Sequence, residues 1–305
     1  MTAEAKPRSL WRRIPGELRI AFWLVLLAAL VVLLIVMLRD GGGGGDSSAS
    51  RHTSVHSFST SDFHSLAYSP AEPGTVFFGH HNGVQMSRDG GETWTQLVQQ
   101  LDFDAMNLAF DPFAPDTLYA AGHNVFYRSD DSGQTWQEVA SNLPGLDIHA
   151  FAASPSEAGV FYAYVVGQGL FASEGGVAAW RPLSAGVPHT TFAVHALPGA
   201  TLLLAAGGDG LLRSNDGGAT WDDSGLSAEA VFAVRGDPGG ERVYAGTNKG
   251  LFVSEDGGGT WRLTGLDDTQ VIVIGVSASD SLDVMAVNSY GQLFHSTDGG
   301  ETWEG

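Results

Sequence analysis

The sequence contains no cysteine and few charged residues, and both absences narrow what the chain can be. Without thiols it has no disulfide scaffold, no thiolate zinc centre, no cysteine nucleophile and no lipoprotein anchor. Charged residues make up 16% of the chain, and 15 Lys+Arg stand against 34 Asp+Glu, a net charge of −19. Because a nucleic-acid-binding surface needs a basic footprint, this balance predicts no nucleic-acid partner.

The negative charge is distributed unevenly along the chain. Residues 1–39 contain six basic and two acidic residues, a local charge of +4, so the remainder carries −23. Within this basic end, Ile20 to Leu38 form an uninterrupted apolar run of 19 residues. A helix of that length spans roughly 28 Å, close to the hydrocarbon thickness of a bilayer.

The flanking charges predict how this segment would be oriented. Five basic residues precede the run and only Arg39 follows it closely. The positive-inside rule therefore predicts a cytoplasmic segment at 1–19, a transmembrane signal anchor at 20–38 and a periplasmic or extracellular remainder. A cleaved signal peptide is the alternative, but the run is longer than a usual signal core and the small-x-small site Ser47-Ser48-Ala49 lies well beyond it. The Gly- and Ser-rich residues 39–53 are typical of a flexible tether.

A repeat organises residues 54–305. An eight-residue box, S-x-D-x-G-x-x-W, occurs at 87–94, 129–136, 214–221, 254–261 and 296–303, and a degenerate copy occupies 173–180. The steps between boxes are 42, 44, 41, 40 and 42 residues. Short apolar runs separated by Gly, Pro and Asp precede each box and predict strands, in the first repeat near 63–68, 75–79 and 83–87, with a fourth after Trp94. Four strands in about 40–45 residues is the period of a propeller blade.

The length of this region predicts one closed ring. Residues 54–305 number 252, which is six times 42. The last repeat ends directly after its box and lacks a fourth strand, whereas 54–58 precede the first repeat unassigned. We therefore expect 54–58 to supply the outer strand of the sixth blade, because closure removes exposed sheet edges.

The box is similar to the Asp-box (BNR) repeat, and residues 60–305 resemble Asp-box β-propellers. That family includes sialidases and other exo-acting glycosidases, sortilin-type receptors, photosystem assembly factors and uncharacterised bacterial exported proteins. The resemblance implies an all-β, six-bladed propeller whose boxes are structural and lie opposite the ligand face. We expect the Ser and Asp side chains to bond turn amides and the Trp rings to pack on the blades. These residues are Ser87, Asp89, Trp94, Ser129, Asp131, Trp136, Ser214, Asp216, Trp221, Ser254, Asp256, Trp261, Ser296, Asp298 and Trp303. Calcium binding is the alternative, but no box has the ligand ladder of a calcium loop.

The loops opposite the boxes gather histidines and carboxylates. Six of the ten histidines map there, several beside Asp. Such side chains suit a transition metal, acid–base chemistry or recognition of a polar ligand. The predicted ligand-binding residues are His64, His80, His81, His123, His149, Asp209 and Tyr290, of which His80, His81 and His123 are metal candidates.

A plainer interpretation of some of these residues stays open. His64 and His149 share a strand position with four apolar residues, so both could be half-buried packing residues; the four are Met106, Phe192, Phe232 and Ile272. A neighbouring position holds Ala or Gly in four repeats but His195 and Arg235 in the other two. Those two either line the channel or only fill space.

Enzymatic activity finds little support in the sequence. Sialidases of this fold, as the resemblance implies, bind a substrate carboxylate with three arginines opposite the boxes, whereas here only Lys249 and Arg235 can reach that face. The −23 charge would also repel an anionic sugar. A neutral-sugar glycosidase needs two carboxylates, and Asp147 and Asp209 are candidates although no spacing identifies a pair. We therefore expect a membrane-anchored binding or scaffold module for a protein or glycan, with no required cofactor and a transition metal as a candidate ligand. An exo-acting glycosidase and a photosystem-type assembly factor are the alternatives.

Overall fold

The computed structural model describes residues 52–304 except 61, 101, 184–186 and 229. The predicted cytoplasmic segment, the transmembrane helix and almost all of the tether lie outside these residues. In the described part of the chain, no helix is long and apolar enough to span a bilayer. One short 3-10 helix, η2 (Gly207–Asp209), accompanies 24 strands there, so the described region is all-β.

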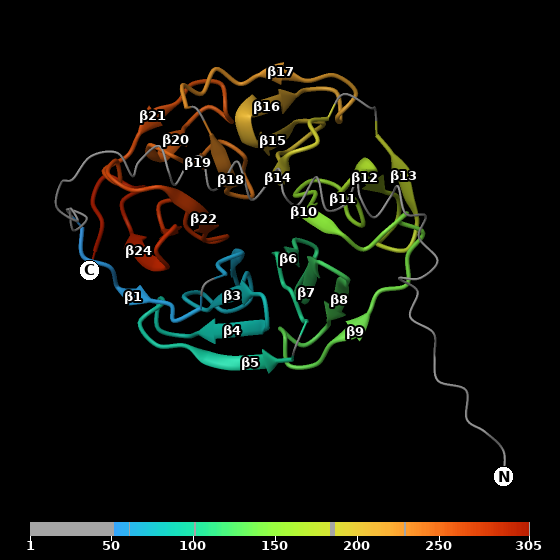
Figure 1. The fold of residues 1–305 in the computed structure, drawn as a ribbon, viewed down its shortest axis with the longest axis horizontal. Coiled ribbons are helices and arrows are strands. Elements are labelled where there is room, and N and C mark those ends of the chain that lie inside the picture. The colour runs from blue at the N-terminus through green and yellow to red at the C-terminus, as the bar shows by residue number, and fades with distance from the viewer. Residues whose placement is uncertain (1–51, 61, 101, 184–186, 229, 305) are drawn as a thin grey trace, which may run out of the picture. The chain divides into compact units, whose positions relative to one another are not determined.

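Six four-stranded antiparallel sheets form the blades of a ring (Figure 1). The first blade consists of β2 (Ser65–Tyr68), β3 (Val76–His80), β4 (Gly83–Ser87) and β5 (Thr95–Gln99). The second consists of β6 (Asn107–Asp111), β7 (Ala114–Gly122), β8 (Val125–Ser129) and β9 (Gln137–Glu138). The third consists of β10 (Ile148–Ala153), β11 (Phe161–Val165), β12 (Gly169–Ser173) and β13 (Trp180–Pro182). The fourth blade consists of β14 (Thr191–Ala196), β15 (Leu202–Ala206), β16 (Gly210–Ser214) and β17 (Asp222–Asp223). The fifth consists of β18 (Val231–Gly236), β19 (Val243–Thr247), β20 (Gly250–Ser254) and β21 (Arg262–Leu263). The sixth consists of β22 (Val271–Val276), β23 (Val284–Asn288), β24 (Gln292–Ser296) and β1 (His56–Ser57). The predicted six-bladed propeller is confirmed.

The sixth blade closes the ring as the sequence predicts. Strand β1 pairs antiparallel with β24, with His56 opposite Leu293 and Ser57 opposite Gln292. Phe58, the next residue, is buried, and its ring stacks on Phe78 of the first blade at 3.8 Å between centroids. The N-terminal stretch of the propeller therefore completes the last blade and packs against the first.

The hydrophobic core lies between neighbouring blades. The second strand of most blades is buried along its whole length, because the adjacent blades cover both of its faces. Aromatic side chains fill the space between the second and third blades, where Phe126 of β8 contacts Phe151 of β10 edge to face. Burial of these continuous apolar runs is typical of strands covered on both sides.

The Asp boxes mark one end of the ring. In every blade, the amide at the fourth box position donates to a carbonyl in the turn between the first two strands or, in the second blade, at the start of the second strand. The donor–acceptor distances are 2.7–3.4 Å, and the pairs are Gly90 to Gly74, Ser132 to Asp116, Gly176 to Gly159, Gly217 to Ala200, Gly257 to Glu241 and Gly299 to Leu282. These contacts place the boxes and the first turns together at what we call the box end. Antiparallel strands then place the loops between second and third strands, and the segments between blades, at the opposite end, which we call the mouth.

Candidate functional site

The side chains of the Asp boxes are used by the turns themselves. In the five intact boxes, the Ser hydroxyl accepts a 2.8 Å hydrogen bond from the amide at the fifth box position. One Asp oxygen, Oδ1, accepts the Thr amide at the seventh position at 2.8–2.9 Å, and the Thr hydroxyl donates to the other. These threonines are partners that our sequence analysis missed, although the residue stands at the same position in all five boxes; they are Thr93, Thr135, Thr220, Thr260 and Thr302.

The degenerate box is held by a residue from the preceding blade. Gly175 stands where the other boxes have Asp, so no carboxylate binds the turn there. Instead, Asn142 accepts the amide hydrogen of Trp180 at 2.7 Å and donates to its carbonyl at 3.2 Å. Asn142, on the segment between the second and third blades, thus hydrogen-bonds the end of the box that lacks its Asp.

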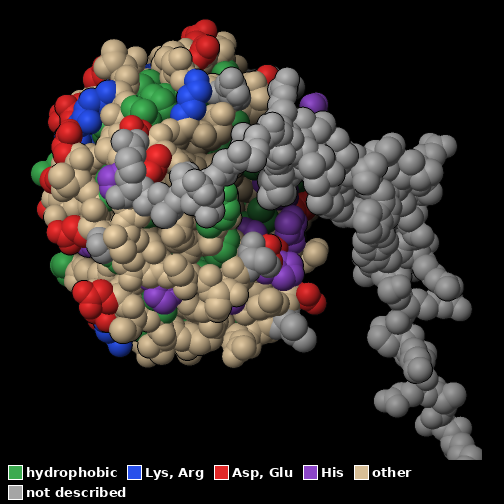
Figure 2. Space-filling view, turned by 60° about the vertical axis from the view of Figure 1, so that its left-hand side comes forward, with side chains coloured by type: hydrophobic (Ala, Val, Ile, Leu, Met, Phe, Trp, Pro, Cys, Tyr) green, Lys and Arg blue, Asp and Glu red, His purple; other side chains and the backbone are tan. Residues whose placement is uncertain are grey.

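The mouth holds a cluster of six polar side chains from the first three blades. We call it the mouth cluster, and it consists of His64, His81, Asp104, His123, Asp147 and His149. Figure 2 shows histidine side chains grouped beside acidic ones on this part of the surface. The sequence placed the four histidines at one end, and the structure brings them into contact with Asp104 and Asp147.

Asp104 is at the centre of the first half of the cluster. Its side chain is only 2% exposed, and it lies on the segment that leads into β6. Its Oδ1 is 3.1 Å from His64 Nε2, and its Oδ2 is 3.4 Å from His81 Nδ1 and 2.5 Å from His123 Nδ1. Three imidazoles thus surround one buried carboxylate. Its Oδ2 accepts a hydrogen bond from His123, whereas its Oδ1, near His64 Nε2, has no hydrogen-bond partner among the described residues.

His123, Asp147 and His149 form the second half. Their facing atoms are close to equidistant: His123 Nε2 is 3.0 Å from His149 Nε2 and 3.4 Å from Asp147 Oδ1, and His149 Nε2 is 3.1 Å from the same oxygen. The backbone fixes this arrangement, because His123 and Asp147 form an isolated antiparallel β-bridge. Asn124 N also donates to Leu146 O at 2.8 Å, and Val166 N donates to Asp147 O at 2.9 Å.

The pKa shifts follow from these contacts. Burial alone would raise the pKa of Asp104, but its contacts with His123 and His64 outweigh burial and hold that pKa below its usual range. In Asp147, burial is likewise outweighed by the contact with His149, which lowers the pKa. The hydrogen bond to Asp104 raises the pKa of His123, against the opposing effect of burial. Both carboxylates are therefore ionised at neutral pH.

Several predicted site residues lie outside the cluster. His80 is buried within the first blade, where its Nδ1 accepts the Asn82 amide at 3.2 Å and its ring stacks on Phe78, and the structure does not bring it together with His81 and His123. Asp209 is exposed in η2 of the fourth blade and belongs to no group of potential metal ligands among the described residues. Tyr290 is 80% exposed on the loop between β23 and β24. Asp104 was not among the ligand-binding residues predicted from the sequence, because the residues around it give no sign that its side chain is buried.

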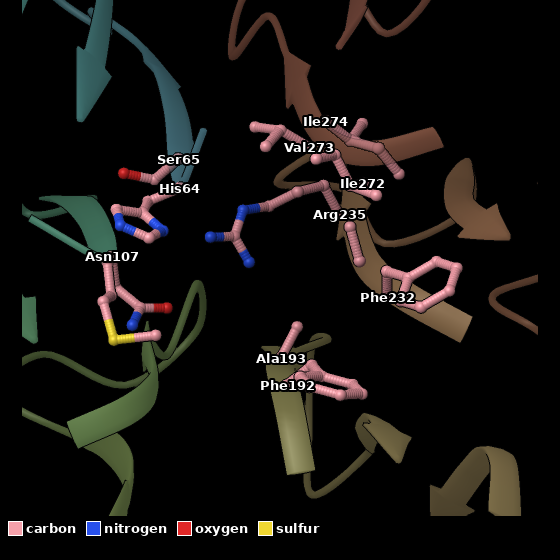
Figure 3. A pocket seen from close by; sticks show the side chains of 12 residues that line it. His64, Ser65, Asn107, Phe192, Ala193, Phe232, Arg235, Ile272, Val273 and Ile274 are labelled. Atoms are coloured by element: carbon pink, nitrogen blue, oxygen red, sulfur yellow. The ribbon is translucent and has the colours of Figure 1, made fainter. Parts of the chain in front are cut away.

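A pocket in the channel adjoins the cluster. Arg235 points into it from β18 toward His64 and Asn107, and the rings of Phe192 and Phe232 lie on another side, 6.1 Å apart (Figure 3). Arg235 therefore lines the channel, one of the two roles that the sequence left open. Burial lowers its pKa to about 10. Burial and the charge of Arg235 together lower the pKa of His195 to about 3, so that imidazole is neutral.

Comparison with known proteins agrees with the fold and the repeat. The family model described as the BNR/Asp-box repeat matches residues 294–304, which contain the last box. The chain is a six-bladed β-propeller that carries Asp-box (BNR) repeats. No curated protein matches its sequence.

Solved structures similar to this Asp-box propeller share its fold at low sequence identity. The GH74 enzyme of Niastella koreensis is 18% identical with a TM-score of 0.55, over 77% of this chain and 37% of that one. The GH74 xyloglucanase of Xanthomonas campestris is 18% identical with a TM-score of 0.55, over 82% and 46%. YCF48 bound to D1 peptide is 18% identical with a TM-score of 0.51, over 77% of each chain. The propeller thus spans less than half of the length of either GH74 protein, and at these identities the likeness shows the fold alone.

Proposed function

We propose that this Asp-box propeller is a binding module, anchored in the membrane through residues 20–38, that holds a protein or glycan partner at its mouth outside the cytoplasm. The mouth cluster is the observation that carries the proposal. Six ionisable side chains converge there from three blades, whereas the box side chains are committed to their own turns. Polar groups that converge at a ring opening suit ligand recognition.

The surroundings of the cluster favour a protein partner over a glycan. Exposed aromatic rings lie at the same end, on Tyr290 with 80% and on Phe192 with 45% of the residue exposed. Such rings are enriched in protein interfaces. The charge of −23 outside residues 1–39 would attract a basic partner over a long range. A structural neighbour, YCF48, has been solved bound to D1 peptide, which supports peptide binding by a protein with a similar fold.

A neutral-sugar glycosidase is the second candidate, and the GH74 neighbours favour it through the fold alone. A glycosidase needs a carboxylic acid that keeps its proton near neutral pH to protonate the leaving group. The carboxyl groups of Asp104 and Asp147 have lowered pKa values, which is the opposite of that requirement. The mouth cluster therefore suits binding better than glycosidic bond cleavage.

Site-specific photo-crosslinking in the full chain tests the binding function. A benzophenone amino acid at Tyr290 reports on the mouth, and one at Phe113 is the matched control, since Phe113 is 52% exposed in a turn at the box end. We expect a discrete crosslinked partner from position 290, lost when His81 and His149 are both changed to Ala. Crosslinks from position 113 alone would contradict the proposal. Turnover of neutral aryl-glycosides that is abolished by Asp147→Asn would favour the glycosidase.

A further inference from the structure

We infer that His123, Asp147 and His149 bind one divalent transition-metal ion of the zinc class at the mouth, through His123 Nε2, His149 Nε2 and Asp147 Oδ1. The inference rests on the proposed function in that it names an ion for the same surface. It differs from the set expected from the sequence, because Asp147 and His149 replace His80 and His81 beside His123.

The spacing of the three atoms is that of a coordination triangle. Their separations are 3.0, 3.1 and 3.4 Å. A tetrahedral ion with metal–nitrogen distances of about 2.0–2.1 Å places neighbouring ligand atoms about 3.3 Å apart. One ion can therefore contact all three atoms without moving the backbone that the β-bridge between His123 and Asp147 fixes.

The unsatisfied oxygen of Asp147 points to the same conclusion. Asp147 Oδ1 is buried and has no hydrogen-bond partner among the described residues, although two imidazole nitrogens lie within 3.4 Å. A buried charged oxygen without a partner is costly. A cation among the three atoms would compensate that oxygen and would also separate the two facing nitrogens.

Asp104 supplies the support that metal-bound histidines usually have. A ligating imidazole normally donates its second N–H to a carboxylate, which fixes the tautomer and the ring orientation. His123 Nδ1 donates to Asp104 Oδ2 at 2.5 Å, so its Nε2 lone pair faces His149 and Asp147. Asp104 is thus a positioning residue for the ion.

The donor set selects the class of ion. Two imidazole nitrogens and one carboxylate suit zinc or copper(II). Calcium and magnesium prefer oxygen ligands alone, and copper(I) prefers sulfur, which no cysteine supplies here. The exposed fractions of the side chains of His123, Asp147 and His149 are 46%, 35% and 27%, so solvent or a donor atom from a partner can reach the ion. Three protein ligands with one open position is the arrangement of a reactive or exchangeable zinc site.

Cobalt(II) titration of the full chain, purified without a histidine tag, tests the site directly. We expect one equivalent of Co²⁺ to give the visible absorption of a low-coordinate ion, and Zn²⁺ to displace it. His149→Ala and Asp147→Asn should each weaken binding at least about 100-fold, and Asp104→Asn about 10- to 100-fold. His189→Ala, a change at an exposed mouth histidine outside the cluster, should leave binding unchanged.

Two outcomes would overturn the inference. The first is the absence of a stoichiometric cobalt spectrum, or a spectrum that persists in His149→Ala. The second is loss of the ion in His81→Ala but not in His149→Ala, which would place the ion on the neighbouring group of His64, His81 and Asp104. Photo-crosslinking from Tyr290 is read separately, so a failed metal titration with an intact crosslink would remove the ion and leave the binding function standing.

Discussion

The Tyr68 hydroxyl donates a 2.7 Å hydrogen bond to Asp283 Oδ1 and joins the first blade to the last across 215 residues of sequence. His295 Nε2 lies 2.9 Å from the same oxygen. Burial, reinforced by the charge of Asp283, raises the pKa of Tyr68, so the hydroxyl stays protonated and remains a donor. The first and last blades are therefore joined by a side-chain hydrogen bond, in addition to the backbone pairing of β1 with β24 that completes the last blade.

Tyr68→Phe should lower the free energy of unfolding by about 1–2 kcal/mol, because it removes a hydrogen bond to a charged, partly buried acceptor. Tyr290→Phe is the control, since that hydroxyl is on an exposed residue and should change stability by less than about 0.5 kcal/mol. Urea denaturation followed by tryptophan fluorescence measures both. Equal stability of the two variants would show that the Tyr68–Asp283 contact does not hold the ring closed.

Phe58→Ala should destabilise the propeller by about 3–5 kcal/mol, because it opens a cavity between the last blade and the first. The ring is 8% exposed and contacts both Phe78 and Trp94. Phe113→Ala is the matched control, since Phe113 is 52% exposed. If Phe58→Ala unfolded at the same denaturant concentration as the control, the closing strand would contribute little to stability.

The Asp boxes should make stability depend on acidity below pH 4. Hydrogen bonds from the Thr260 amide, the Ser254 hydroxyl and the Thr260 hydroxyl lower the pKa of Asp256 from 3.8 to about 2. A carboxyl with a lowered folded-state pKa stabilises above its unfolded value, and that contribution is lost as the pH falls from about 4 toward 2. The stability difference between wild type and Asp256→Ala should therefore be constant above pH 5 and shrink toward pH 2. If the stability difference between wild type and Asp256→Ala did not change with pH, the charge of the Asp256 carboxylate would not be what stabilises the turn.

Arg235→Met should raise the midpoint of thermal unfolding by about 2–4 °C, which corresponds to about 1 kcal/mol for a domain of this size. The Arg235 side chain lies in the channel, and among the described residues its one hydrogen bond goes to the neighbouring Val234 carbonyl at 3.2 Å. Burial lowers its pKa to about 10, so keeping it charged in the folded state costs free energy. Arg213→Met is the contrasting variant, because Arg213 bonds Asn215 at 3.0 Å and Gly257 O at 2.9 Å and should lose stability. A lower midpoint for Arg235→Met would indicate a favourable partner in the channel.

Much of the fold could be predicted from the sequence, because a local signal is repeated. Each box needs its Ser, Asp, Gly and Trp at fixed spacing to satisfy one turn, so the boxes give the number of blades directly. The missing fourth strand after Trp303 also identified 54–58 as its replacement, since an unpaired edge strand is unfavourable. The sequence did not predict the contact of Asn142 with the degenerate box. Residues 38 positions apart leave no local sequence pattern when they meet in the fold.

The sequence by itself determined the all-β ring, the end at which polar side chains collect and the separation of that end from the boxes. Only the tertiary structure decided which of those side chains meet. His80 and His81 are neighbours in sequence, but His80 is the last residue of β3 and is buried in its blade, while His81 begins the turn that follows and faces Asp104. His123 and Asp147 come from different blades and meet through one β-bridge, and the distances that favour a metal ion follow from the packing of those two blades.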